Sequence, residues 1–438
     1  MKKISVLLLI PIALILAPLA QANSGPERIL RLATTIACAE KNLQCQLLQV
    51  SRQKMAPDLV FYRTLIKVGP GDYDVIAVNR LIRERNGVPV RTNGSFFFIP
   101  GSSGDFNSVL LTAMGDRGMG VFLGKHSIDV WGIDLRNVQI PADATGLPNA
   151  REWGYDLQIN DVRLATRITR YVRVLTGQGL DRIILAGHSS GAALTYAVAN
   201  AEAVLPRTYR DVGGLIPIDM IYKLPPSATE QIQLSCDIVG LYRYYNDAGL
   251  FFFDNFATIA MAKLAQTDPN GISPYGPPLT NLQYALQTAG GLWFWPLYPI
   301  HPWAVVRDDA GIAVDGRFTQ VSDMLENFVI SPAYPIPNAM SADVFSTSCA
   351  TMDTPYDDNL DKIRVPVLYI GAAGGFGPLG EYTTQLLGSK DLRTIMIQLL
   401  SDADAQNDFG HMEAFTADQA TELIWEPVRR WIVNHQSH

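Results

Sequence analysis

Short apolar runs alternate with helical stretches along most of this chain, and this alternation restricts the fold more than any other feature. Runs of the kind seen in covered strands lie at residues 73–83, 95–100, 128–135, 182–186, 213–218, 365–370 and 392–400. Apolar residues with helical spacing lie at residues 108–114, 160–175, 192–203 and 417–433. This order predicts an α/β fold with a mostly parallel central sheet and helices on both faces.

The alternation stops between Lys223 and Lys362. We expect residues 223–362 to form a largely helical cap, inserted before the penultimate strand, with the core domain at residues 23–222 and 363–438. Most aromatic residues of the cap should fill its own core, and a few should line a substrate pocket. These aromatic residues are Phe251, Phe252, Phe253, Trp293, Phe294, Trp295 and Trp303. Ahead of the first strand, residues 26–55 are polar and are predicted to be helical.

The first residues have the pattern of an export signal. Lys2 and Lys3 precede an apolar run at residues 4–19, and Ala20-Gln21-Ala22 follows with small residues at the cleavage positions. We expect a signal peptide at residues 1–22 and a periplasmic or secreted protein. An uncleaved membrane anchor is the alternative, but the run is shorter than the ~20 apolar residues of a spanning helix.

Four cysteines follow the signal, an even number that favours disulfides in an exported chain. The preferred pairs are Cys38 with Cys45 and Cys236 with Cys349. Seven residues of unbroken helix would separate two Cα atoms by about 10 Å, so the first pair requires a helix break near Asn42. A zinc site is the weaker alternative, because no Cys-x-x-Cys spacing occurs.

The acidic balance of the chain bears on its partners. The formal net charge is -7, and no run of Lys or Arg follows the signal. Because nucleic acid and anionic membranes attract basic patches, neither is an expected partner. A small-molecule substrate remains the expected ligand.

The stretch Gly187-His188-Ser189-Ser190-Gly191 joins a predicted strand to an Ala-rich predicted helix. A Gly-x-Ser-x-Gly turn in this context is a nucleophile elbow, in which a strained turn exposes the Ser hydroxyl. Glycines two positions to either side let strand and helix approach closely. The prediction is that Ser189 is a nucleophile, whereas an ordinary Gly/Ser loop is the alternative.

A serine nucleophile needs a base within hydrogen-bond reach, and the chain has six histidines. His411 lies between the last predicted strand and the last predicted helix, which is the place of the base in hydrolases with the chain order Ser, acid, His. We therefore predict that His411 is the base. The others precede a strand, belong to the elbow, or lie in the cap or tail: His126, His188, His301, His435 and His438.

Acyl transfer also needs N–H donors where the oxyanion forms. The residue after the nucleophile and the turn after an early strand usually supply them. Here these are the backbone N–H groups of Ser190 and of Ser102 in Pro100-Gly101-Ser102-Ser103-Gly104. A plain Gly/Ser loop is the alternative for this turn.

These motifs give the chain a resemblance to the α/β-hydrolase superfamily from about Tyr73 to the end, interrupted by the cap. The matching stretches are PGSSG, DVWGIDLRN, AGHSSGAAL and DFGHMEAF. The resemblance implies a central sheet of about eight strands and a catalytic Ser, acid and His. It does not identify a substrate, and a cap of roughly 140 residues is unusually long for this architecture.

The acid is the part of the pattern that departs from the family. Gly371-Ala372-Ala373-Gly374 follows the run at 365–370, where the acid is expected, and offers no carboxylate. Asp219, at the end of the run at 213–218, is the preferred acid, and Glu381 is the alternative. The remaining candidates are Asp402, Asp404 and Asp408.

The main hypothesis is hydrolysis of a carboxylic ester through an acyl-enzyme on Ser189, with no metal or organic cofactor required. The aromatic cap favours an apolar or aromatic substrate. An amidase, lactonase or acyltransferase would use the same residues. A catalytically silent periplasmic binding protein with this fold is the alternative from another class.

Overall fold

The computed structural model describes residues 25–111, 117–292 and 300–436 of the 438-residue chain. The predicted signal peptide therefore lies outside the described residues, as do Trp293, Phe294, Trp295 and His438. Within the described ranges, no helix is both long enough and apolar enough to cross a membrane.

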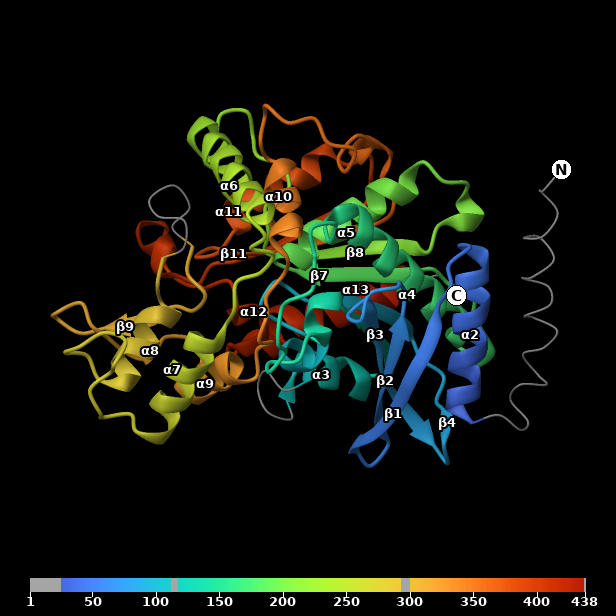
Figure 1. Ribbon diagram of the computed structural model, residues 1–438, viewed down its shortest axis with the longest axis horizontal. Helices are drawn as coiled ribbons and strands as arrows, with labels where there is room; N and C mark the ends of the chain where they lie inside the picture. The colour runs from blue at the N-terminus through green and yellow to red at the C-terminus, as the bar shows by residue number, and fades with distance from the viewer. Residues whose placement is uncertain (1–24, 112–116, 293–299, 437–438) are drawn as a thin grey trace.

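A ten-stranded sheet forms the centre of the described structure (Figure 1). Its strand order is β1-β2-β3-β6-β5-β7-β8-β11-β12, and β4 pairs with β3. The pairs from β6 to β12 are parallel, whereas β1 to β3 pair antiparallel and β3 also pairs antiparallel with β6. The predicted fold class, a mostly parallel sheet with flanking helices, is confirmed. The strands are β1 (Gln46–Ala56), β2 (Leu59–Lys67), β3 (Val75–Arg85), β4 (Val88–Pro89), β5 (Gly94–Ile99), β6 (Ile128–Asp134), β7 (Ile183–His188), β8 (Val212–Ile218), β11 (Val367–Ala372) and β12 (Leu392–Ile397).

Helices cover both faces of the sheet and create two apolar cores. On one face lie α2 (Pro26–Glu40), α4 (Tyr155–Leu175) and α5 (Ser190–Ala203). On the other face lie the π-helix η1 (Asn107–Leu111), α3 (Met119–Lys125), the π-helix η8 (Thr421–Trp425) and α13 (Glu426–His435). Along β5, Phe97 and Ile99 enter the first core, and Phe96 and Phe98 enter the second. Because alternate side chains are buried on opposite faces, the central strands read as continuous apolar runs.

Between β8 and β11 the chain builds a largely helical cap in two groups. Helices α6 (Thr229–Asp247) and α10 (Asn338–Ser346) pack together at the top of Figure 1. A second group, at the lower left of Figure 1, contains α7 (Phe256–Thr267), α8 (Asn281–Ala289), α9 (Val321–Val329) and the two-stranded sheet of β9 (Val305–Arg307) and β10 (Ala313–Gly316). Short elements complete the chain around the sheet. These are the 3-10 helices η3 (Arg136–Gln139), η4 (Arg207–Tyr209), η5 (Leu360–Lys362), η6 (Glu381–Leu386) and η7 (Asp402–Asn407), with α11 (Gly377–Gly380) and α12 (Glu413–Thr416).

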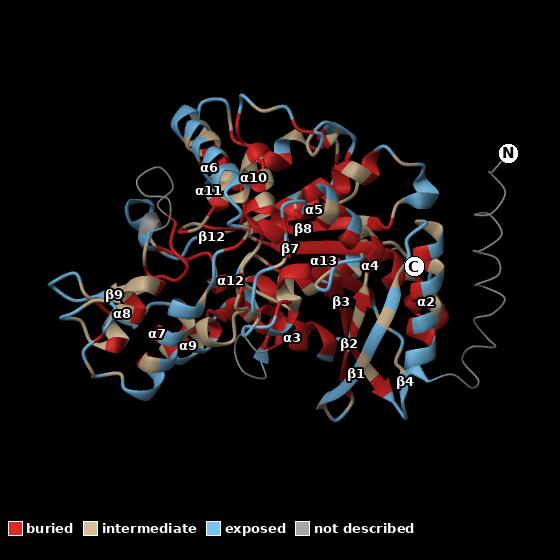
Figure 2. Cartoon of the chain, viewed as in Figure 1, coloured by how far each residue is buried: buried red, intermediate tan, exposed pale blue. Residues whose placement is uncertain are grey.

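The prediction of helix through residues 26–55 is wrong for its second half. Helix α2 ends at Glu40, Asn42 has a φ of 52°, and the chain turns back into β1. Most β1 residues are exposed, as the pale blue arrow in Figure 2 shows, so this strand lacks the apolar alternation that identifies half-buried strands. Together with β2 and β4, it also raises the sheet above the expected eight strands.

Two disulfides join the cysteine pairs that the sequence favours. Cys38 and Cys45 have a Cα–Cα distance of 6.0 Å, which the break in the helix at Asn42 makes possible. Cys236 of α6 bonds to Cys349, just beyond α10, with a Cα–Cα distance of 4.8 Å. The second bond closes a loop between residues 113 positions apart and ties the two helices of the upper cap group together.

Removing the second disulfide is expected to cost more stability than removing the first. In the loop-entropy model a crosslink over about 100 residues contributes roughly 4 kcal/mol, and a much shorter loop contributes less. We expect the Cys236→Ser/Cys349→Ser variant to lose about 2–4 kcal/mol of unfolding free energy. Urea denaturation without reductant, compared with Cys38→Ser/Cys45→Ser, tests this. A larger loss in Cys38→Ser/Cys45→Ser than in Cys236→Ser/Cys349→Ser would contradict the prediction.

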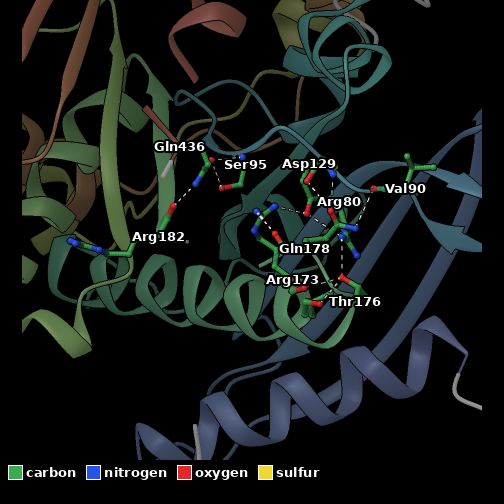
Figure 3. A network of polar contacts seen from close by, with 11 residues as sticks. Arg80, Val90, Ser95, Asp129, Arg173, Thr176, Gln178, Arg182 and Gln436 are labelled. Atoms are coloured by element: carbon green, nitrogen blue, oxygen red, sulfur yellow. Dashed lines mark hydrogen bonds and ion pairs between the residues drawn. The ribbon is translucent and has the colours of Figure 1, made fainter. Parts of the chain in front are cut away.

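A buried polar network lies between the sheet and α4 (Figure 3). The carboxylate of Asp129 on β6 accepts two hydrogen bonds from Arg80, at 2.9 and 3.0 Å, and one from Arg173, at 2.8 Å. Near the C-terminus, Gln436 accepts from the backbone N–H of Ser95 and donates to the carbonyl of Arg182. These bonds attach Gln436 to the starts of β5 and β7, next to the ion pairs of Asp129.

Candidate active site

Ser189 lies at the turn between β7 and α5, in a conformation that few residues adopt. Its φ is 56° and its ψ is -131°, and its N–H donates to the carbonyl of Ile218 at the end of β8. Backbone strain of this kind is common at functional sites. A Cβ on Gly187 would lie 2.2 Å from the carbonyl oxygen of Gly191, and a Cβ on Gly191 would lie 2.2 Å from that of Ile99. Both glycines are therefore required by close backbone approach.

Asp219 follows β8 directly, and its carboxylate faces the loop that carries His411. Nδ1 of His411 lies 2.6 Å from Oδ2 of Asp219, and each side chain is only 1 % exposed. A buried carboxylate in this position fixes the tautomer and the orientation of an imidazole. Asp219 also has a φ of 49°, so the acid and Ser189 both lie in strained turns at the ends of adjacent strands.

The end of β11 and the turn after it have no carboxylate of their own and supply hydrogen-bond donors instead. The N–H of Ala372 donates to Oδ1 of Asp219 at 2.9 Å, and the N–H of Phe376 donates to Oδ2 at 3.2 Å. A Cβ on Gly375 would lie 2.2 Å from Oδ2. The small residues of this turn therefore allow its backbone to enclose a carboxylate that comes from the neighbouring strand.

The other candidate acids lie elsewhere. Glu381 begins η6, and its carbonyl accepts from the hydroxyl of Thr384. Asp402 and Asp404 are exposed in η7. Asp408 is buried, and it accepts hydrogen bonds from the backbone N–H groups of Leu399, Leu400 and Phe409. Asp408 thus shapes the loop before His411, whereas Asp219 supplies the carboxylate that contacts the imidazole.

The loop of His411 is held by backbone bonds to the cap. The N–H of His411 donates to the carbonyl of His301 at 3.0 Å, and that of Met412 donates to the carbonyl of Pro302 at 2.8 Å. His301 is buried, and its own N–H donates to the carbonyl of Gly374. The sequence placed His301 in the cap, and the fold brings it against the His411 loop.

His188 is a second histidine at the site for which the sequence analysis assigned no role. Its Nε2 lies 2.9 Å from the carbonyl oxygen of His411, and the two rings are 4.2 Å apart. Burial, with the adjacent His411 imidazole, holds the pKa of His188 well below its ordinary value. A neutral His188 therefore donates from Nε2 and links the elbow to the loop of the predicted base. The sequence signal for a role of His188 at this site was its position next to Ser189 in the Gly-x-Ser-x-Gly motif.

The predicted oxyanion donors flank Ser189. Ser190 is the first residue of α5, so its N–H has no acceptor within the helix. Ser102 lines the same cavity as Ser189 and His411, and a Cβ on the preceding Gly101 would lie 2.8 Å from Cβ of Ser189. This cavity has a volume of about 220 Å³. It has room for a small molecule beside Ser189, Ser102 and His411.

Glu413 is a fully buried acid next to the predicted base, and it predicts a pH dependence of stability. Its carboxyl accepts from the N–H of Gly410 at 2.5 Å and from the hydroxyl of Thr319 at 3.2 Å. Burial raises the pKa of Glu413 to about 8, so the folded protein retains a proton that the unfolded chain releases near pH 4.5. The contribution of this group to stability is therefore lost as pH rises from about 4.5 to 8.

The Glu413→Gln variant isolates this effect, because it keeps the shape of the side chain without the ionisation. We expect its stability relative to the wild type to rise from pH 5 to pH 9 by on the order of 4 kcal/mol. Urea unfolding of both proteins at the two pH values measures the gain. A stability difference that stays constant with pH would contradict the raised pKa of Glu413.

Comparison with solved structures shows the same architecture in one of the three similar proteins described here, the first. A candidate lipase from Sulfolobus solfataricus superimposes with a TM-score of 0.57 at 16% identity, over 88% of this chain and 99% of that one. A soluble variant of monoglyceride lipase from Saccharomyces cerevisiae gives a TM-score of 0.42 at 12% identity, over 90% and 97% of the two chains. An esterase from Thermogutta terrifontis gives 0.40 at 13%, over 90% and 100%. No family model and no curated protein sequence matches the chain.

Proposed function

We propose that this chain, which has the α/β-hydrolase fold, is a serine hydrolase that cleaves carboxylic esters through an acyl-enzyme on Ser189. One observation carries the proposal: His411, whose Nδ1 lies 2.6 Å from the buried carboxylate of Asp219, lines the same cavity as a strained Ser189. A nucleophile, a base and the group that orients the base are thus assembled around one space.

In the proposed first half-reaction, Oγ of Ser189 bonds to the ester carbonyl carbon while Nε2 of His411 takes its proton. The carbonyl oxygen becomes an oxyanion, and the N–H groups of Ser102 and Ser190 stabilise it. Asp219 keeps the proton on Nδ1 and stabilises the imidazolium. Collapse of the intermediate breaks the bond to the alcohol oxygen, which receives the proton from His411.

In the second half-reaction, water replaces the alcohol next to His411. The imidazole takes a proton from the water as it attacks the acyl carbon, and then returns that proton to Ser189 as the acid leaves.

We further propose that the protein acts outside the cytoplasm. Two disulfides support this, because they persist in oxidising compartments.

A fluorophosphonate probe tests the nucleophile without knowledge of the natural ester. We expect the folded wild-type protein to be labelled once per chain and Ser189→Ala to remain unlabelled. The exposed Ser401 provides a matched control, since Ser401→Ala should be labelled like the wild type. A folded wild-type protein that takes up no label would overturn the proposed serine hydrolase and favour a silent binding protein.

A further inference from the structure

The structure has two chambers that meet at Ser189, and we infer that they divide an ester between them. We propose that the leaving alcohol occupies the chamber lined by His411, that the acyl group occupies the other, and that the substrate joins an apolar acid to a neutral alcohol bearing hydroxyl groups. This inference rests on the proposed function and extends it to substrate class.

The first chamber, here the His411 chamber, has a volume of about 220 Å³. Its walls come from the loop of His411 and from the lower cap group, and include Met412, Trp303, Thr288, Asn327 and Phe328. The second chamber, here the Met220 chamber, has a volume of about 160 Å³. Its walls come from the segment after β8, from the upper part of the cap and from the turn after β11, and include Met220, Phe253, Ile336, Val344, Phe345 and Phe376. Ser102 and Ser189 border both chambers.

The position of His411 assigns the two halves of the ester. In the tetrahedral intermediate, the imidazole that took the serine proton must return it to the leaving oxygen. That oxygen and its substituent therefore lie on the side of His411, whose side chain lines the first chamber and is absent from the described walls of the second. The acyl chain must then leave the carbonyl carbon in the other direction, past Ser190 and into the Met220 chamber.

The walls of the Met220 chamber favour an apolar acyl group. Beyond the residues around Ser189, most of its lining residues are aliphatic or aromatic, and Asn338, Ser341 and the phenol of Tyr242 add polar groups. Ile336 is only partly buried and stands within this lining. An apolar acid gains free energy when it leaves water for such a wall.

The His411 chamber differs in that several polar residues of the cap, among them Thr288, Asn327 and Ser331, line it beside the apolar ones. The hydroxyl of Thr288 donates to the carbonyl of Tyr284, and that of Ser331 donates to the carbonyl of Asn327. Each hydroxyl hydrogen is thus engaged, while each oxygen keeps a lone pair that can accept. Among the described residues that line this chamber there is no Lys or Arg, so its polar wall suits hydroxyl donors better than carboxylate or phosphate.

Matched ester pairs test the two chambers separately. We expect wild-type kcat/KM to be higher for p-nitrophenyl octanoate than for p-nitrophenyl acetate, and higher for 1-octanoylglycerol than for methyl octanoate. Ile336→Trp should lower the octanoate to acetate ratio about tenfold, and Ile336→Ala should not lower it. Neither change should move the glycerol to methyl ratio.

Thr288→Val should do the reverse, because it removes an acceptor without changing the shape of the wall. We expect about a fivefold fall in the glycerol to methyl ratio, with the octanoate to acetate ratio unchanged and recovery in Thr288→Ser. The inference is overturned if the two sites affect each other's ratio, or if neither ratio responds. It also fails if wild-type protein prefers methyl octanoate. Labelling by fluorophosphonate in every variant keeps these outcomes distinct from a failure of the serine mechanism, which would abolish labelling in the wild type.

Discussion

Asp219→Asn is expected to lower kcat for ester hydrolysis by about ten-thousand-fold while leaving the fold intact. The carboxylate now accepts from Nδ1 of His411 and from the N–H groups of Ala372 and Phe376. An amide has one acceptor oxygen for these three donors. If that oxygen serves the backbone, the amide NH2 faces Nδ1 and holds the wrong tautomer, and no negative charge remains to stabilise the imidazolium.

Glu381→Gln is the matched control, since this carboxylate was the alternative acid and begins η6. Its activity should remain within a factor of about two of the wild type, in keeping with the small effect of most changes away from a site. Steady-state kinetics on a p-nitrophenyl ester, with circular dichroism to check folding, distinguishes the two acids. Near-normal turnover in Asp219→Asn would refute the assignment, and a large loss in Glu381→Gln would point to the alternative.

Asp129→Asn should produce the largest loss of stability, about 3–5 kcal/mol. Asp129 is 0 % exposed, and its charge neutralises the buried guanidinium groups of Arg80 and Arg173. Burial alone would raise the pKa of Asp129, but the two cations outweigh it and hold that pKa below its ordinary value. Without the carboxylate, two cations would share a buried site from which their common ion-pair partner is missing.

Asp58→Asn provides the comparison, because its ion pair with Arg83 is partly exposed on both sides. Water screens such a pair, so the expected change is at most about 1 kcal/mol. Urea denaturation of both variants at pH 7 measures the contrast. Equal losses of unfolding free energy would show that the buried ion pairs of Asp129 with Arg80 and Arg173 contribute no more stability than an exposed pair.

The sheet could be predicted from the sequence wherever both of its faces are covered. Strands such as β5 and β7 are buried at every position and mostly apolar, because alternate side chains enter different cores. The sequence does not predict β1, because most of its residues are exposed and show no apolar pattern, and its pairing with β2 determines its structure. β1 and β2 form a hairpin with Ala56 opposite Leu59, so backbone pairing rather than burial of an apolar face holds β1 in the sheet.

The parts of the site differ in the same way. Ser189 and His411 stand in local contexts, a strand-turn-helix and a loop between the last strand and helix, that can be recognised along the chain. The support from His188, Glu413 and His301 depends on contacts between distant segments, so their types and positions gave little warning. Asp219 could be predicted only in part. The sequence shows an acidic residue at the end of a strand, but it does not show that the backbone at the end of β11 donates hydrogen bonds to it.

The attachment of the cap sets the boundaries for any exchange of specificity between this protein and another. The cap begins directly after the loop that carries Asp219, and its carbonyls at residues 301 and 302 pair with the backbone of the His411 loop. A transplanted cap would therefore have to retain residues 219–222 and 300–303 from the host. Within those limits the helices α6 and α10, joined by the Cys236–Cys349 disulfide, form one exchangeable unit, and α7, α8 and α9 form a second.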